Sequence, residues 1–193
     1  MSFELMETTV AQVHAAMKAG ELTCRQLVEM YLARIEAYDQ KGPAINSVIT
    51  VNPKALEEAD ACDAYLKEHG EFNGPLHGIP VMLKDNCNTT DMPTTAGSVA
   101  LKGWVPPTDA FVTKRIRESG AIILAKTNLH EFAIWGESVS SILGQAVNPY
   151  DPTVLRAALP AAPALPALPT SASSVSAPIP STPSVPPRLQ TPW

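Results

Sequence analysis

Residues 78–85 read Gly78-Ile79-Pro80-Val81-Met82-Leu83-Lys84-Asp85, and this stretch decides the fold that we predict. Its side chains are apolar at both alternating sets of positions until Lys84, which is typical of a strand that is buried on both faces. Ile79, Val81 and Leu83 are expected on one face of that strand and Lys84 on the other. Pro80 cannot donate a hydrogen bond to a neighbouring strand, so we expect it at the start of the strand or on a sheet edge.

The residues that follow predict a helix and a second buried strand. Asp109 is expected to cap the helix, and Gly120 is expected to end it. The apolar run 121–125 predicts the strand. Asn128, three residues before a glutamate, predicts the cap of a further short helix that extends through Trp135. Helices that alternate with apolar strands predict an α/β architecture with crossover connections.

The N-terminal part of the chain predicts three helices and one strand. Thr9 and Thr23 each precede a glutamine by three residues, which predicts capping boxes at two helix starts. A β-branched stretch at 45–51 predicts the strand. Asn52-Pro53 predicts the start of the third helix, with the proline at its first position. Glycines predict where these helices end, namely Gly20, Gly42 (followed by Pro43) and Gly70.

Composition narrows the class of protein. The chain has 193 residues, enough for one domain with a sizeable core, and its formal net charge of −5 argues against a nucleic-acid surface. No uncharged apolar run approaches the length of a membrane span, and the N-terminus lacks the basic-then-apolar pattern of a secretory signal. Cys24, Cys62 and Cys87 stand far apart, which favours reduced thiols in a cytoplasmic protein over a disulfide framework or a metal site.

The chain changes character between Pro152 and Thr153. All 19 acidic residues and all 10 glycines lie before this point, whereas ten of the 19 prolines lie after it. We therefore interpret residues 1–152 as a partial enzyme domain and 153–193 as a low-complexity tail that buries too little apolar surface to become ordered. A shifted reading frame or a mis-spliced exon would explain such a tail. The rival hypothesis is a natural truncated paralogue with a functional Pro-rich end.

Five blocks of sequence, in the same order, resemble the amidase signature family. They are residues 76–86 (Leu-His-Gly-Ile-Pro-Val-Met-Leu-Lys-Asp-Asn), 94–98 (Thr-Thr-Ala-Gly-Ser), Asp109-Ala110 with Gly120-Ala121-Ile122, 126–133 (Lys-Thr-Asn-Leu-His-Glu-Phe-Ala) and 148–151 (Asn-Pro-Tyr-Asp). Each block alone is weak, but five in order form a specific signal. The resemblance looks greatest to the fungal branch. It implies an incomplete N-terminal part of that family's fold, a mixed sheet flanked by helices.

The resemblance also implies a hydrolase of C–N amide bonds that uses a Ser–cis-Ser–Lys triad, with no cofactor and no metal. The lysine of that triad corresponds to Lys84 in this sequence. The bridging serine is implied in a Gly/Ser-rich loop shortly after 148–151, and the nucleophilic serine in a later Gly-rich segment. Neither segment follows here, because residues 152–160 read Pro-Thr-Val-Leu-Arg-Ala-Ala-Leu-Pro. The chain is therefore expected to be truncated before the serine-containing loops and to lack catalytic competence.

The residue chemistry of Lys84 agrees with the role that the resemblance implies. Burial at the end of a strand disfavours the ammonium form and lowers the pKa of a lysine. A neutral amine can then accept a proton from a serine hydroxyl. Without the resemblance, the simpler interpretation is a surface lysine at a strand end that pairs with Asp85.

Other residues are weaker candidates for the missing nucleophile. Ser98 lies in the block at 94–98, which in the family lies beside the site without supplying the nucleophile. Cys87, three positions after Lys84, is expected to be a small buried apolar group. The remaining candidates lack flanking glycines, a fixed position or metal-ligand spacing; they are Ser138, Ser140, Ser141, Ser171, Ser173, Ser174, Ser176, His14, His69, His77 and His130.

Two functions remain open from the sequence. The first is an amidase-family protein whose substrate, when the site is complete, is a small-molecule amide. The second is a non-catalytic interaction or regulatory protein that uses the domain remnant or the Pro-rich tail. Less than half of the family's fold would leave strand edges and apolar helix faces uncovered, so we expect marginal stability or a protein partner that covers the exposed core. Nucleic acid and membrane are not expected as partners.

Overall fold

A three-stranded mixed sheet forms the centre of the molecule. In the computed structural model, which describes residues 3–5 and 8–149, its strands are β1 (Val48–Val51), β2 (Pro80–Lys84) and β3 (Ile122–Thr127). The order is β1-β3-β2, with β2 parallel and β1 antiparallel to β3. The predicted α/β class is confirmed. The expected boundary at 152 and the tail 153–193 lie outside the described residues.

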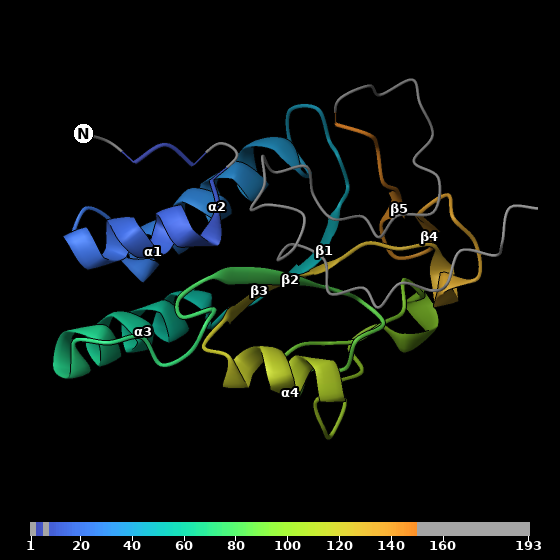
Figure 1. Cartoon of the computed structure of the whole chain (residues 1–193). Coiled ribbons are helices and arrows are strands. Elements are labelled where there is room, and N and C mark those ends of the chain that lie inside the picture. Colours follow the sequence, from blue (N-terminus) through green and yellow to red (C-terminus); the bar gives the residue numbers. More distant parts are fainter. Residues whose placement is uncertain (1–2, 6–7, 150–193) are drawn as a thin grey trace, which may run out of the picture.

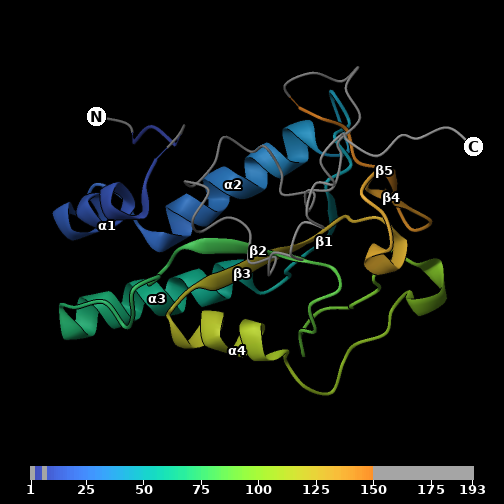
Figure 2. The ribbon, with the colours of Figure 1, turned by 45° about the vertical axis from the view of Figure 1, so that its right-hand side comes forward.

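Helices cover both faces of this sheet. Among the described residues the α-helices are α1 (Val10–Ala19), α2 (Cys24–Tyr38), α3 (Ala55–His69) and α4 (Phe111–Glu118). α4 lies on the opposite side of the sheet from α1 and α2 (Figure 1). Shorter elements follow: η1 (Val99–Leu101), η2 (Glu131–Ala133), β4 (Val139–Ser140) and β5 (Gly144–Gln145). The turned view in Figure 2 shows β4 and β5 beyond the end of β3, away from α3.

Two apolar clusters fill the space between helices and sheet. The larger joins side chains of α1, α2 and α3 to Leu124 of β3, and the smaller joins Ile116 of α4 to Val81 and Ile123. The prediction that β2 is buried on both faces is confirmed, and Pro80 is its first residue. The prediction for Ile79 is wrong, because Ile79 precedes the strand and packs in the larger cluster, so the two-residue period does not reach it.

The ladder between β2 and β3 contains one irregularity. Val81 is opposite Ile123, but the next residue, Met82, is opposite Ala125, so Leu124 has no register partner on β2. The carbonyl of Leu124 instead accepts a hydrogen bond from the backbone N–H of Asn52 (2.9 Å). An extra residue on one strand of a pair bends that strand and changes which face its later side chains occupy.

The predicted capping boxes are confirmed at both helix starts. The hydroxyl oxygens of Thr9 and Thr23 accept hydrogen bonds from backbone N–H groups three residues later, and each glutamine side chain accepts from the backbone N–H of its threonine. Gly20 and Gly70 follow α1 and α3 with φ of 73° and 70°, a conformation that glycine adopts without steric cost. α2, however, ends at Tyr38, before Gly42.

Three predicted helix starts are wrong because a polar side chain finds another partner. Pro53 lies outside α3, where the side chain of Asn52 accepts a hydrogen bond from the backbone N–H of Lys54 (2.8 Å). Asp109 does not cap α4; its carboxylate accepts from the backbone N–H of Thr90 (2.8 Å) and pairs with an arginine. Asn128 donates to two backbone carbonyls instead of capping η2. No helix in the described part of the chain has the length and hydropathy to cross a membrane.

Candidate active site

Lys84 is the last residue of β2, at the carboxyl end of the parallel pair that β2 forms with β3. The carboxyl ends of parallel strands are where α/β proteins place their sites. Its side chain is half-buried, and this burial lowers the pKa of Lys84, while the charge of a Cys87 thiolate would raise it. A lowered pKa is the direction that a general base needs at neutral pH.

A second lysine, Lys126 on β3, lies near the end of β2 and is fully buried. Its ammonium nitrogen lies 3.2 Å from Oδ1 of Asp85, which is also fully buried, and it donates a hydrogen bond to Oγ1 of Thr94 (2.8 Å). Burial lowers the pKa of Lys126, and the Asp85 carboxylate opposes this effect. Among the ion pairs of the described residues, Asp85 thus pairs with Lys126, whereas the simpler interpretation paired it with Lys84.

The predicted block at 94–98 is held against the end of β2 by Asp85. Oδ2 of Asp85 accepts hydrogen bonds from the backbone N–H (3.0 Å) and the hydroxyl of Thr95. The carbonyl of Asp85 accepts from the N–H of Ala96 (2.9 Å), and its own N–H donates to the carbonyl of Thr127 (3.1 Å). One residue therefore joins β2, β3 and the block at 94–98 directly after Lys84.

Ser98 and Cys87 lie near this junction without the features of a nucleophile. Ser98 is buried, and its hydroxyl oxygen accepts a hydrogen bond from the backbone N–H of Ala100 (3.3 Å), which caps η1. Cys87 is half-buried, and burial raises the pKa of its thiol, which disfavours the reactive thiolate. The hydroxyl of Ser98 therefore stabilises the start of η1. Cys87 was expected to be a small buried apolar group, and in the structure it is partly exposed.

The other candidate residues are dispersed. The hydroxyl of Ser140 donates to the carbonyl of Gly144 (3.3 Å), and that of Ser141 accepts from the backbone N–H of Val99 (3.1 Å). His77 is buried against the side chain of Asn73. In the described ranges, no three His, Cys, Asp or Glu side chains are grouped in a way that could hold a metal ion. Ser171, Ser173, Ser174 and Ser176 lie outside the described residues.

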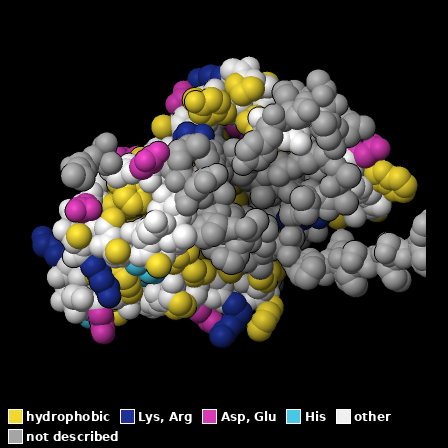
Figure 3. Space-filling model, turned by 45° about the horizontal axis from the view of Figure 1, so that its top comes forward, with side chains coloured by type: hydrophobic (Ala, Val, Ile, Leu, Met, Phe, Trp, Pro, Cys, Tyr) yellow, Lys and Arg dark blue, Asp and Glu magenta, His cyan; other side chains and the backbone are white. Residues whose placement is uncertain are grey.

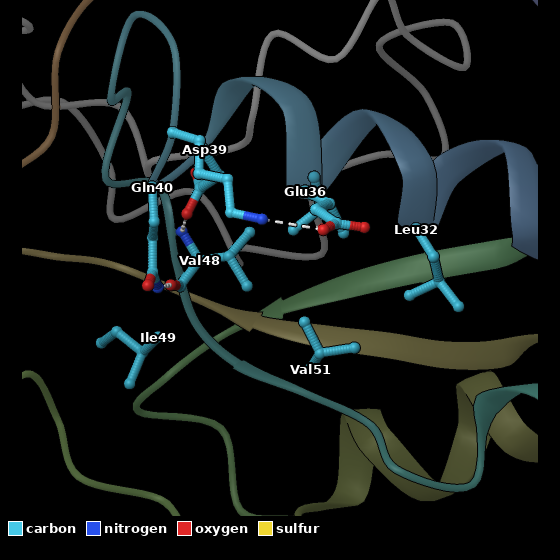
Figure 4. Close-up of a pocket in the computed structure, with 9 residues that line it drawn as sticks. Leu32, Glu36, Asp39, Gln40, Val48, Ile49 and Val51 are labelled. Atoms are coloured by element: carbon cyan, nitrogen blue, oxygen red, sulfur yellow. Dashed lines mark hydrogen bonds and ion pairs between the residues drawn. The ribbon is translucent and has the colours of Figure 1, made fainter.

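A surface hollow between α2 and β1 is separate from Lys84. Its lining side chains come from the C-terminal half of α2, the turn after it, and β1 (Figure 4). An ion pair between Lys41 and Glu36 (2.8 Å) spans part of it. β1 is the edge strand opposite to β2, and no predicted site residue lines the hollow, so we do not assign the candidate chemistry to it.

The sequence did not single out Lys126 as a functional residue. The available signal was a lysine that directly continues the apolar run 121–125, because a charged side chain in a buried strand requires a buried partner. The partner could not be identified without the register, in which Leu83 of β2 is opposite Lys126. That register is a tertiary property, and it brings Asp85 within reach.

Comparisons with known proteins agree on one family. A sequence model described as Amidase matches residues 26–156. The chain is 43% identical over 151 residues to a glutamyl-tRNA(Gln) amidotransferase subunit of Streptomyces coelicolor, a match that covers 78% of this chain and 30% of the relative. It is 44% identical over 134 residues to a probable amidase of Arabidopsis thaliana, a match that covers 68% of this chain and 26% of the relative.

Solved structures give the same result for the fold. The peptide amidase of Stenotrophomonas maltophilia matches with a TM-score of 0.70 and 46% identity, covering 76% of this chain and 31% of the amidase. A fatty acid amide hydrolase matches with a TM-score of 0.69 and 26% identity, covering 76% of this chain and 25% of the hydrolase. The chain thus spans about a third or less of the length of these proteins.

Proposed function

The chain belongs to the amidase family, and from this premise we propose that Lys84 is the general base of a site that hydrolyses C–N amide bonds. The observation that carries the proposal is the position of Lys84, half-buried at the carboxyl end of β2 with its pKa lowered by burial. A lower pKa increases the fraction of Lys84 that is a neutral amine at any given pH. The neutral amine is the form that accepts a proton.

In the proposed reaction Lys84 moves protons and does not form a bond to the substrate. Its amine accepts the proton of a bridging serine hydroxyl, and that serine takes the proton of an attacking serine. The attacking oxygen adds to the amide carbon, the C–N bond breaks, and the proton returns through the same relay to the leaving nitrogen. Water then enters by the reverse route and releases the carboxylic acid, leaving Lys84 as a neutral amine again.

We propose that the 193-residue chain does not perform this reaction alone. The family pattern puts both serines after residue 151, and the sequence there contains no glycine. Without a nucleophile there is no covalent route, and each absent oxyanion donor would cost roughly 2.7–4 kcal/mol of transition-state stabilisation. The named relatives act on amides or belong to amidotransferases, so the proposed substrate class is a carboxamide, in a site completed by residues from another polypeptide segment.

A chimera provides the test. Residues 1–149 would be joined to the C-terminal portion of the Stenotrophomonas maltophilia peptide amidase, and ammonia release from peptide amides would be measured by a coupled assay. We expect turnover by the chimera, loss of at least about 100-fold in kcat for its K84A variant, and no turnover by the 193-residue chain. K102A, at an exposed lysine, is the matched control and should retain activity.

Three results would contradict the proposal. One is a K84A chimera that keeps the kcat of its parent, because Lys84 would then carry no proton. Another is steady ammonia release by the unmodified 193-residue chain, because a nucleophile would then exist within it. A chimera that folds, binds a peptide amide and yet has no turnover would also count against Lys84 as a working base in this sequence.

A second candidate function is a non-catalytic interaction protein, and exposed apolar side chains favour it. Phe111, Ile134 and Trp135 are 80%, 76% and 69% exposed. On the face shown in Figure 3, hydrophobic side chains are visible at several places between charged ones. If the chain acts by binding, a tagged 193-residue chain should retain a specific protein partner, and the I134S/W135S variant should lose it. K84A should retain the partner.

A further inference from the structure

The buried ion pair between Lys126 and Asp85 is expensive to maintain and has no place in the proposed proton relay. Both side chains are fully inaccessible to solvent, and a buried pair of this kind is commonly no more stabilising than apolar residues of the same size. A feature of this kind can be retained for another reason. Its position beside Lys84 indicates what that reason is.

Asp85 is held at each of its polar groups. Its backbone N–H and carbonyl bind Thr127 and Ala96, and its carboxylate oxygens contact Thr95 and Lys126. Lys126 in turn donates to Thr94 and lies 3.4 Å from the carbonyl of Pro93. The backbone at Lys84 is therefore clamped between β3 and the block at 94–98, which fixes the origin of its flexible side chain.

The pair also has an electrostatic effect. Asp85 directly follows β2, and its carboxylate contacts Thr95 and Lys126, so we argue its effect on Lys84 through charge and backbone. An uncompensated carboxylate one residue away would favour the ammonium form of Lys84. The ammonium of Lys126, 3.2 Å from Asp85, cancels that charge.

From this geometry we infer that Asp85 and Lys126 are positioning residues, which fix the backbone of Lys84 and neutralise the negative charge beside it so that Lys84 can act as a base. The inference rests on the proposed function of Lys84. It assigns no contact with substrate to either residue. The other charged or titratable groups that interact with these lysines are Cys87, with both of them, and Asp91, with Lys126.

The test is an NMR titration of the Lys84 side chain in the full chain, with 13C-labelled lysine and the signal assigned by its loss in K84M. All variants carry C87A, so that no thiol titrates nearby. K126Q keeps a donor for Asp85 but removes the cation, and we expect it to raise the pKa of Lys84 measurably. K126R keeps the cation and should leave the pKa of Lys84 as it was.

D85N gives the opposite sign and separates charge from packing. It removes the carboxylate and leaves the Lys126 cation, so the pKa of Lys84 should fall, and D85N/K126Q should return it towards the parent value. If the pair only supported packing, both single variants would expose Lys84 to water and raise its pKa together. That shared direction, or an unchanged pKa in a folded K126Q, would overturn the inference.

Folding and the proposed function are kept separate from this result. Far-UV circular dichroism identifies variants that fold; if K126Q does not, D85N against D85N/K126Q still measures the effect of the Lys126 charge, and a pKa of Lys84 that is the same in both overturns the inference. The inference depends on differences between variants. The general-base role is tested by the chimera instead. If K84A does not lower the kcat of the chimera, that role is contradicted, while the effect of the Lys126 charge on the pKa of Lys84 can still be observed.

Discussion

At the scale of single residues, Lys84 illustrates a conflict between stability and chemistry. Burial disfavours its ammonium form, so the folded state is less stable than it would be with an apolar side chain at this position. The same burial prepares the amine to accept a proton. Active-site residues often carry such a cost, and replacing them can stabilise the fold while removing activity.

We therefore predict that K84M raises the free energy of unfolding at pH 7. The increase should be about 0.5–1 kcal/mol, a small value because the Lys84 side chain is only partly buried. Urea denaturation followed by circular dichroism measures it, with K102M at an exposed position as the control that should not change. A K84M chain less stable than its parent would mean that the lysine stem contributes more packing than the charge costs.

The pH dependence of this difference follows from the direction of the shift. The pKa of Lys84 in the folded chain lies below its ordinary value of 10.5, so the unfolded chain binds more protons between those two values. As the pH rises through that window the penalty on the folded state disappears. The stability gap between K84M and its parent should accordingly be constant below the folded pKa and shrink towards pH 10.5, in urea titrations at several pH values.

Gly78, before β2, gives a second residue-scale prediction. Its φ is 67°, and a Cβ atom there would overlap Sγ of Cys24, which is fully buried. Gly20 has a similar φ of 73° but open space around the Cβ position. G20A should therefore cost only the conformational term, about 1 kcal/mol, whereas G78A should cost about 1–3 kcal/mol more. Equal unfolding free energies for the two variants would show that the side chains around Cys24 rearrange to accommodate the added methyl group.

At the scale of elements, the helix starts are defined by short side-chain contacts. The hydroxyl of Thr23 caps α2, while the residue at the corresponding position of α3, Lys54, makes no capping hydrogen bond with its side chain. T23A should thus lower the free energy of unfolding by about 1 kcal/mol, and K54A should leave it nearly unchanged. Thermal unfolding measures both, and a loss in K54A equal to that in T23A would contradict this account of α2.

The same contacts explain how far the sequence could predict the elements. Capping boxes are local, so Thr9 and Thr23 were predicted correctly from residues three positions apart. Asp109 fits a cap equally well in sequence, but Thr90 and Arg117 compete for its carboxylate across the fold. A residue pattern records which bonds a side chain can make, and the packed structure decides which one forms.

The candidate site could also be predicted only in part from the sequence. Lys84 was predicted because strand burial followed by a charged residue is visible in the sequence, and the resemblance gave that residue a role. The junction around Asp85 was not predicted, since it depends on the β2–β3 register and on the block at 94–98 returning to the strand end. Both are consequences of long-range pairing, which one sequence does not contain.

At the scale of the whole molecule, the exposed apolar residues near η2 predict a surface that binds other apolar molecules. Ile134 and Trp135 are more than two-thirds exposed, so replacing them should reduce the apolar area of the surface and leave the packing of the core unchanged. I134S/W135S should reduce the fluorescence of a bound anilinonaphthalene dye and raise solubility, with stability changed by no more than about 0.5 kcal/mol. E137S, in the same segment, is the control. Unchanged dye binding would show that the dye binds to a different apolar surface of the molecule.

The unpaired Leu124 in β3 makes this strand intolerant of changes in length. If the codon for Leu124 were deleted, the ladder with β2 would become regular and the later residues would keep their partners, but the larger cluster would lose a buried side chain and the backbone N–H of Asn52 would lose the carbonyl that it binds. Natural variants of this sequence should therefore have insertions and deletions in surface loops, and the number of residues between Ile122 and Thr127 should not change.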